Sequence, residues 1–123
     1  MYKIIVNEEY TEDSGSISKH NIIDEYINMI INKININANK KIKVALDCGN
    51  AAGCIVAPKL YKIFNINLIE LYCDIDGTFP NHHPDPTVDK NLIDLQNLVL
   101  ENKCDLGIAF DGDADRIIAI DEK

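Results

Sequence analysis

The sequence predicts an α/β fold, in which a mostly parallel sheet is flanked by helices and preceded by an amphipathic linker helix. Two observations lead to this prediction. From residue 41 onwards, short apolar runs typical of buried strands alternate with segments of helical periodicity. Loops rich in Asp, Gly and Pro separate them, as expected for strand–helix–strand units with right-handed crossovers. With 123 residues, 46% of them hydrophobic, the chain is long enough for one such domain.

The N-terminal part has no strand pattern. Residues 1–18 are mixed in composition and are interpreted as a linker or the end of a preceding domain. A helix is predicted over 20–35, capped by the polar residues at its start, and residues 35–41 break its pattern. Its apolar face consists of Ile23, Ile27, Ile30, Ile31 and Ile34.

The domain itself is expected over 19–123. Its first helix follows a turn of small residues and ends near Phe64, with Pro58 tolerated only in its first turns. Its second helix is predicted to begin at Asp89, which would cap it, and to bury one leucine-rich face. The predicted strands are 42–46, 67–72, 105–110 and 117–120.

Charge and cysteine content exclude several functions. The chain carries 12 Lys and Arg against 20 Asp and Glu, a net charge of −8, which argues against nucleic acid and anionic membranes as partners. It has no apolar stretch as long as a membrane span, and its N-terminal apolar run is too short for a signal peptide. The four cysteines form no paired zinc-ligand spacing and suit reduced thiols, so a cytoplasmic protein is expected.

Three loops are expected at the carboxyl ends of the strands, where ligands bind in sheets of this kind. They cover residues 47–53, 73–88 and 111–116. The small residues of the first loop are interpreted as allowing tight packing of the strand against the helix. Asp47 is interpreted as a residue that orients the ligand-binding residues without touching the ligand itself. His82 and His83 are expected to shape the second loop through local hydrogen bonds.

The third loop is the candidate metal site. Asp111, Asp113 and Asp115 alternate directly after a buried strand, and three carboxylates this close repel one another unless a cation joins them. Ligands that are all oxygen favour a hard ion, Mg²⁺ or Ca²⁺, rather than zinc. Arg116, the only arginine of the chain, follows at once. A metal beside an arginine is suited to stabilising a phosphoryl group during its transfer.

The second loop offers an alternative. Residues 74–78 resemble the nucleophile motif of the haloacid-dehalogenase-like phosphatases, with Asp74 as the attacking carboxylate and Asp76 as the acid or base. Only about 35 residues separate this motif from the acidic loop, which leaves little space for the other motifs of that family. A non-catalytic metal-binding module is the third hypothesis.

Taken together, the three loops resemble the second domain of the α-D-phosphohexomutases. The resemblance is carried by residues 46–53, 76–86 and 105–116, in the family's order, and is strongest to the bacterial phosphomannomutase/phosphoglucomutase subgroup. It implies a Mg²⁺ site at Asp111, Asp113 and Asp115, and a place for Arg116 at the reaction centre.

The resemblance also implies a function and its limits. Members interconvert hexose 1-phosphates and hexose 6-phosphates through an active-site phosphoserine and a hexose 1,6-bisphosphate intermediate. They have four domains. Neither the serine loop of the first domain nor the sugar-recognition and phosphate-binding loops of the third and fourth domains are identified in these 123 residues. The chain is therefore expected to be one domain of such an enzyme, to share its hexose phosphate substrate with other domains, and to be inactive alone.

Overall fold

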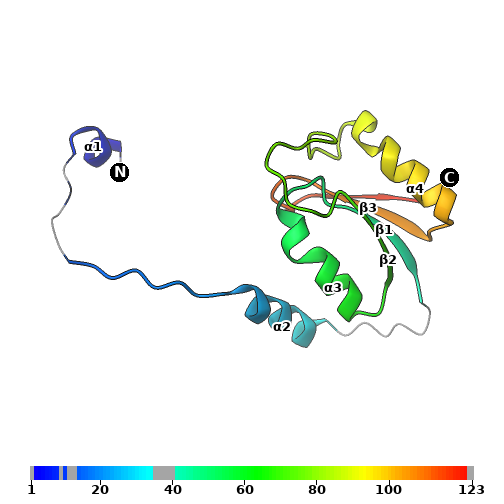
Figure 1. The fold of residues 1–123 in the computed structure, drawn as a ribbon, viewed down its shortest axis with the longest axis horizontal. Helices are drawn as coiled ribbons and strands as arrows, with labels where there is room; N and C mark the ends of the chain where they lie inside the picture. The colour runs from blue at the N-terminus through cyan, green and yellow to red at the C-terminus, as the bar shows by residue number, and fades with distance from the viewer. Residues whose placement is uncertain (1, 9, 11–13, 35–40, 122–123) are drawn as a thin grey trace.

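The computed structural model describes residues 2–8, 10, 14–34 and 41–121. Its central feature is a four-stranded sheet in the order β2-β1-β3-β4, shown in Figure 1. The strands are β1 (Lys43–Asp47), β2 (Asn67–Leu71), β3 (Leu106–Phe110) and β4 (Ile117–Ile120). The predicted α/β class and the number of strands are confirmed.

Strand pairing brings the predicted loops to one edge of the sheet. Strand β1 pairs in parallel with β2 and with β3, so the segments after all three strands begin at the same edge. Strand β4 runs antiparallel to β3, with Phe110 opposite Ile117. The loop over 111–116 therefore closes a hairpin at that edge, which makes the sheet mixed rather than fully parallel.

The sheet is covered on both faces because alternate residues of β1 point in opposite directions. Ala45 packs in one cluster with Leu95 and Val99 of helix α4 (Ile93–Asn102). Val44 and Leu46 pack in the other cluster with Ala57 of helix α3 (Ala57–Ile63). A helix therefore lies on each side of the sheet, as the ribbon in Figure 1 shows.

Close packing of α4 on the sheet depends on a glycine in β3. A Cβ atom at Gly107 would lie 2.7 Å from Cγ2 of Val99, which is closer than two carbon atoms can approach. Any larger residue would push α4 away from the sheet.

The helices differ from the prediction in three details. Helix α2 (Ile23–Lys33) is shorter than expected, with Ile27 buried, and all of the predicted break over 35–41 except Lys41 lies outside the described residues. The first predicted crossover helix is split into a 3₁₀ turn, η1 (Ala52–Ile55), and α3, with Pro58 in the first turn. A short helix α1 (Tyr2–Val6), which was not predicted, buries no residue. A run of five residues is too short to show helical periodicity.

The predicted cap at Asp89 is wrong. A 3₁₀ turn, η2 (Asp89–Leu92), precedes α4, and Leu92 is the residue before the α-helix, so no side chain caps it. Asp89 instead begins the 3₁₀ turn. The tighter turn joins the second loop to α4, and this tertiary requirement overrides a local capping preference.

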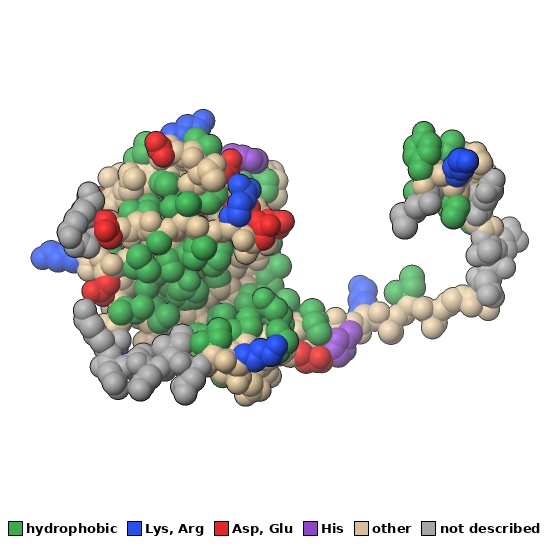
Figure 2. Space-filling model, turned by 180° about the vertical axis from the view of Figure 1, so that it is seen from behind, with side chains coloured by type: hydrophobic (Ala, Val, Ile, Leu, Met, Phe, Trp, Pro, Cys, Tyr) green, Lys and Arg blue, Asp and Glu red, His purple; other side chains and the backbone are tan. Residues whose placement is uncertain are grey.

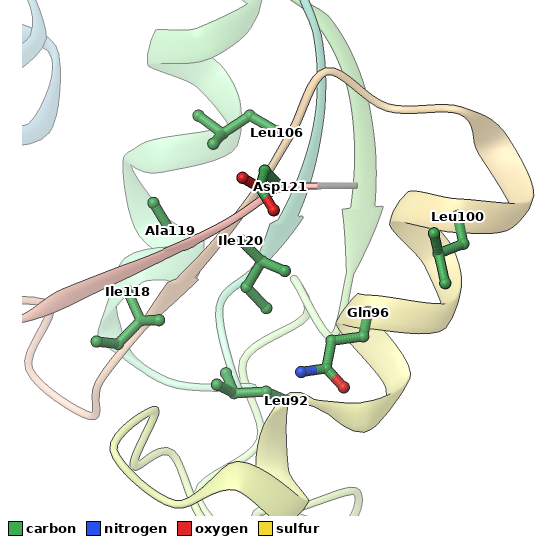
Figure 3. A pocket seen from close by; sticks show the side chains of 8 residues that line it. All are labelled: Leu92, Gln96, Leu100, Leu106, Ile118, Ala119, Ile120 and Asp121. Carbon is green, nitrogen blue, oxygen red and sulfur yellow. The ribbon is translucent and has the colours of Figure 1, made fainter. Parts of the chain in front are cut away.

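The surface of the molecule separates apolar from charged areas. Figure 2 shows hydrophobic side chains in the middle of one face of the α/β unit, with acidic and basic side chains toward its border. A pocket of about 710 Å³ lies beside α4 and the edge strand β4. Figure 3 shows its largely aliphatic lining, which includes Leu100, Ile118 and Ile120. No described helix is long and apolar enough to cross a membrane.

Candidate metal centre

The acidic loop is a tight turn closed by its own backbone. The N–H of Asp111 donates to the carbonyl of Arg116 at 3.3 Å, and the N–H of Ala114 donates to the carbonyl of Asp111 at 3.1 Å. Ala114 has a φ of 62°, in the left-handed region that non-glycine residues seldom adopt. This backbone conformation turns the chain back toward β4.

This turn brings the three predicted carboxylates together. One oxygen from each of Asp111, Asp113 and Asp115 lies within 4.8 Å of the other two. Asp111 is buried, whereas Asp113 and Asp115 are exposed. One anchored and two solvent-facing carboxylates leave room for a hydrated cation, which is how Mg²⁺ is usually held.

The electrostatics of the cluster fit a cation. The charges of Asp113 and Asp111 raise the pKa of Asp115, because three carboxylates so close together resist full ionisation. A hard divalent ion removes this conflict. The donor set is all oxygen, so the residues present suit Mg²⁺ better than a soft metal.

Arg116 holds the buried member of the cluster. Its backbone N–H donates to Oδ1 of Asp111 at 3.1 Å, and its Nε donates to Oδ2 at 2.8 Å. Burial acts to raise the pKa of Asp111, but these hydrogen bonds outweigh it and the pKa is lowered. The carboxylate therefore stays ionised and in one orientation, ready to bind a cation.

The guanidinium of Arg116 also reaches the second loop. Its NH1 lies 4.0 Å from Oδ1 of Asp85, and its Nε lies 3.6 Å from Oδ1 of Asp115. The side chain is 58% exposed, so its terminal N–H groups remain accessible to an anion. The arginine thus links the acidic loop to the loop over 73–88.

Asp47 and His82 join the first loop to the second. Asp47 is 1% exposed and accepts hydrogen bonds from the N–H of Gly49 at 2.8 Å and from Nε2 of His82 at 3.0 Å. The other ring nitrogen of His82, Nδ1, faces the carbonyl of His83 at 2.9 Å. Both ring nitrogens of His82 therefore face oxygen atoms, which fixes the orientation of the imidazole between the first and second loops. The local hydrogen bonding expected of His82 is present.

Asn50 is a structural residue of the site that the sequence did not single out. Its Nδ2 donates to the carbonyl of Asp74 at 2.7 Å, and its Oδ1 accepts from Nδ2 of Asn81 at 2.8 Å. Its own carbonyl accepts from the N–H of Asp76 at 3.0 Å. The signal available in the sequence was an Asn after a Gly in a turn, since Asn tolerates the left-handed conformation it adopts here, with a φ of 57°.

The alternative motif does not join the metal cluster. Oδ1 of Asp76 accepts from the N–H of Thr78 at 2.9 Å and from its hydroxyl at 2.7 Å, a local turn that uses the carboxylate itself. Among the described residues, Asp111, Asp113 and Asp115 form the one group with metal-ligand spacing, and neither Asp74 nor Asp76 belongs to it. The arrangement that the phosphatase hypothesis requires is therefore not found.

Fold and site together define an α/β domain with an acidic, arginine-anchored loop at the carboxyl edge of its sheet, a design suited to phosphoryl chemistry. Residues 24–123 match the family model described as phosphoglucomutase/phosphomannomutase, alpha/beta/alpha domain II. The chain belongs to this family, and the resemblance inferred from the three loops is confirmed.

Similar proteins support the same family. A phosphomannomutase/phosphoglucomutase of Pseudomonas putida is 44% identical over 109 residues, which cover 89% of this chain and 23% of that protein. A phosphoglucomutase of Neisseria meningitidis is 44% identical over 106 residues, or 86% of this chain and 23% of that protein.

A crystal structure of a phosphoglucomutase/phosphomannomutase family protein from Burkholderia thailandensis superposes with a TM-score of 0.89 at 36% identity. The superposition covers 98% of this chain and 26% of that one. The chain spans about a quarter of the length of the curated relatives it matches.

Proposed function

We propose that this chain is the Mg²⁺-binding domain of a phosphohexomutase, which interconverts hexose 1-phosphate and hexose 6-phosphate, with mannose or glucose as the sugar. The whole enzyme would use an active-site phosphoserine, contributed by another domain, and a hexose 1,6-bisphosphate intermediate. One observation carries the proposal: in a chain of this family, three carboxylates converge within 4.8 Å beside an arginine.

The aspartates and the arginine of the acidic loop would have different roles. Asp111, Asp113 and Asp115 would hold Mg²⁺, with Asp111 fixed by Arg116 and the other two facing solvent. When bound, Mg²⁺ would neutralise charge on the phosphoryl group during transfer. Arg116, anchored through its Nε, can direct its terminal N–H groups to phosphate oxygens, because charge-assisted hydrogen bonds of this kind position an anion firmly.

The remaining domains of the enzyme would complete the site. The hexose phosphate would lie between this loop and those domains, and we propose no nucleic acid or membrane partner. The excess of acidic residues supports this, and reduced cysteines suit a cytoplasmic enzyme. We further propose that residues 1–18 are a linker or the end of a preceding domain, and that the second domain of the phosphohexomutase begins at about residue 19.

A domain exchange tests the proposal. This chain replaces the matching segment of the Pseudomonas putida relative, and conversion of glucose 1-phosphate to glucose 6-phosphate is measured. We expect an active chimera, and loss of activity in the same chimera carrying Asp113→Asn, with Asp76→Asn as the control that retains activity. A chimera that folds but is equally active with Asp113→Asn would contradict the assignment of the metal site.

The 123-residue chain itself separates the three hypotheses. The mutase proposal predicts no mutase activity and weak Mg²⁺ binding, because Mg²⁺ completes its coordination with water and phosphate oxygens. Hydrolysis of a generic phosphoester by this chain, abolished by Asp74→Asn, would favour the phosphatase. Tight Mg²⁺ binding, combined with an inactive chimera, would favour a metal-binding module.

A further inference from the structure

Three of the four free cysteines lie close together on one side of the sheet, apart from the acidic loop. Cys48 follows β1, Cys73 follows β2 and Cys54 lies in η1. The sulfur atoms of Cys48 and Cys73 are 3.4 Å apart. Cys48 lies one residue after β1 and Cys73 two residues after β2, and these strands are parallel neighbours. The hydrogen bonds between β1 and β2 therefore hold the two thiols next to each other.

The two sulfur atoms of this pair differ in environment. Cys48 is 0% exposed, whereas Cys73 is half-buried and its Sγ also lies 3.4 Å from the carbonyl of Leu71. The hydrogen bond that the thiols share lowers the pKa of Cys73 and raises that of Cys48. Cys73 is the less buried residue of the pair, and its lowered pKa favours the thiolate, which is the nucleophilic form of the thiol.

A metal is a poorer explanation of this cluster. Among the described residues, no group that includes these cysteines has the spacing of metal ligands. Cys54 Sγ lies 3.6 Å from the carbonyl of Tyr72 rather than between the other two sulfur atoms. The close contact is a contact of two thiols, which is the arrangement that precedes a disulfide.

We propose that Cys48 and Cys73 are a thiol pair that forms a reversible disulfide with a small-molecule disulfide as oxidant. The Cys73 thiolate attacks the oxidant, forms a mixed disulfide and releases one small thiolate. Cys48, after losing its proton to solvent, attacks the Cys73 sulfur and displaces the second small thiolate. Two protein thiols are oxidised by two electrons, and the oxidant is reduced to two thiols.

The position of the pair gives the bond a consequence for the site. Cys48 follows Asp47, which holds His82, and Cys73 precedes Asp74, whose carbonyl is held by Asn50. The disulfide would join the bases of the first and second loops covalently. It would add a covalent bond between two loops that hydrogen bonds and packing connect.

The test uses the folded chain incubated with oxidised glutathione and then alkylated under denaturing conditions. We expect two of the four thiols to resist alkylation and to react again after treatment with dithiothreitol. The mass of the oxidised chain before alkylation should be lower by two hydrogen atoms, with no glutathione attached. Because no Lys or Arg lies between Cys48 and Cys54, tryptic mapping cannot separate these two cysteines, and variants are needed.

The variants assign the bond. Cys54→Ser combined with Cys104→Ser leaves only the proposed pair and should still lose both thiols. In the Cys48→Ser chain, the reaction should stop at the mixed disulfide, with one glutathione retained on Cys73. Four reactive thiols in the oxidised native chain, or loss of the disulfide in the Cys54→Ser chain while circular dichroism shows it folded, would overturn the proposal.

Discussion

Two acidic loops follow strands of the same sheet, yet only one gathers its carboxylates. In the loop over 74–78, the carboxylate of Asp76 accepts hydrogen bonds from the backbone N–H and the hydroxyl of Thr78. In the loop over 111–116, Asp111 is buried and held from the side by Arg116, and the two following carboxylates converge on it. The difference teaches that acidic composition alone does not bring carboxylates together. In the loop over 111–116, a buried aspartate bonded to Arg116 is the point on which the other two converge.

The largest expected effect is on metal affinity. Asp111→Asn removes one charge from the cluster and should weaken Mg²⁺ binding by at least about tenfold, because affinity follows the number of charged ligands. Isothermal titration or Mn²⁺ competition measures this change. Asp76→Asn, in the other acidic loop, is the matched control and should leave the affinity unchanged. Equal losses in both variants would remove the distinction between the loops.

The next effect is on stability and compares two glycines near these loops. Gly49 has a φ of 53°, and a Cβ there would lie 2.9 Å from Cβ of Pro84. Gly49→Ala should therefore cost about 1–3 kcal/mol of unfolding free energy, measured by urea titration.

Gly77 is the control for this prediction. A Cβ at Gly77 meets nothing within 4 Å, so Gly77→Ala should change stability by less than about 0.5 kcal/mol. A similar loss in both variants would show that the contact with Pro84 does not hold the second loop in place.

A smaller effect is expected from Asn50. Asn50→Ala removes two side-chain hydrogen bonds that tie the first loop to the second, and should cost about 1–2 kcal/mol. Amide hydrogen exchange over residues 74–81 should become faster, whereas exchange in β3 should not. Unchanged exchange in the second loop would contradict the role assigned to Asn50.

The smallest effect concerns pH and a third aspartate at this edge. Burial raises the pKa of Asp47 above its ordinary value of 3.8, although hydrogen bonds from Gly49 and His82 oppose the shift. The folded state therefore binds a proton more tightly than the unfolded state. The stability from this proton is fully present below about pH 3.8 and is lost as pH rises through the folded pKa.

Asp47→Asn should remove this dependence. Its amide can accept from Gly49 and donate to His82, so the hydrogen bonds persist without the titration. Urea unfolding from pH 4 to pH 7 should show the variant gaining stability over the parent chain as pH rises, by about 1 kcal/mol or less. If the variant instead loses stability relative to the parent chain as pH rises, the ionised Asp47 is stabilised in the folded state by protonated His82.

Much of the fold was readable from the sequence because the strands are short and apolar and the helices are periodic. The four strands, the position of Pro58 and the leucine face of α4 follow from residue patterns alone. The start of α4 was not readable, because the 3₁₀ turn at Asp89 serves the connection to the second loop. Helix α1 was missed because five residues show no period.

The sequence by itself determined the three loops, the family they belong to and the identity of the acidic residues, because composition and spacing are local properties of the chain. Only the tertiary structure decided that Asp111 is buried and bonded to Arg116, that Asn50 holds the second loop, and that Cys48 meets Cys73. Asp111 and Arg116 lie in one loop, and the turn of the hairpin brings their side chains together. The contacts of Asn50 and of Cys48 join residues that follow different strands, so they depend on strand pairing and not on a local pattern.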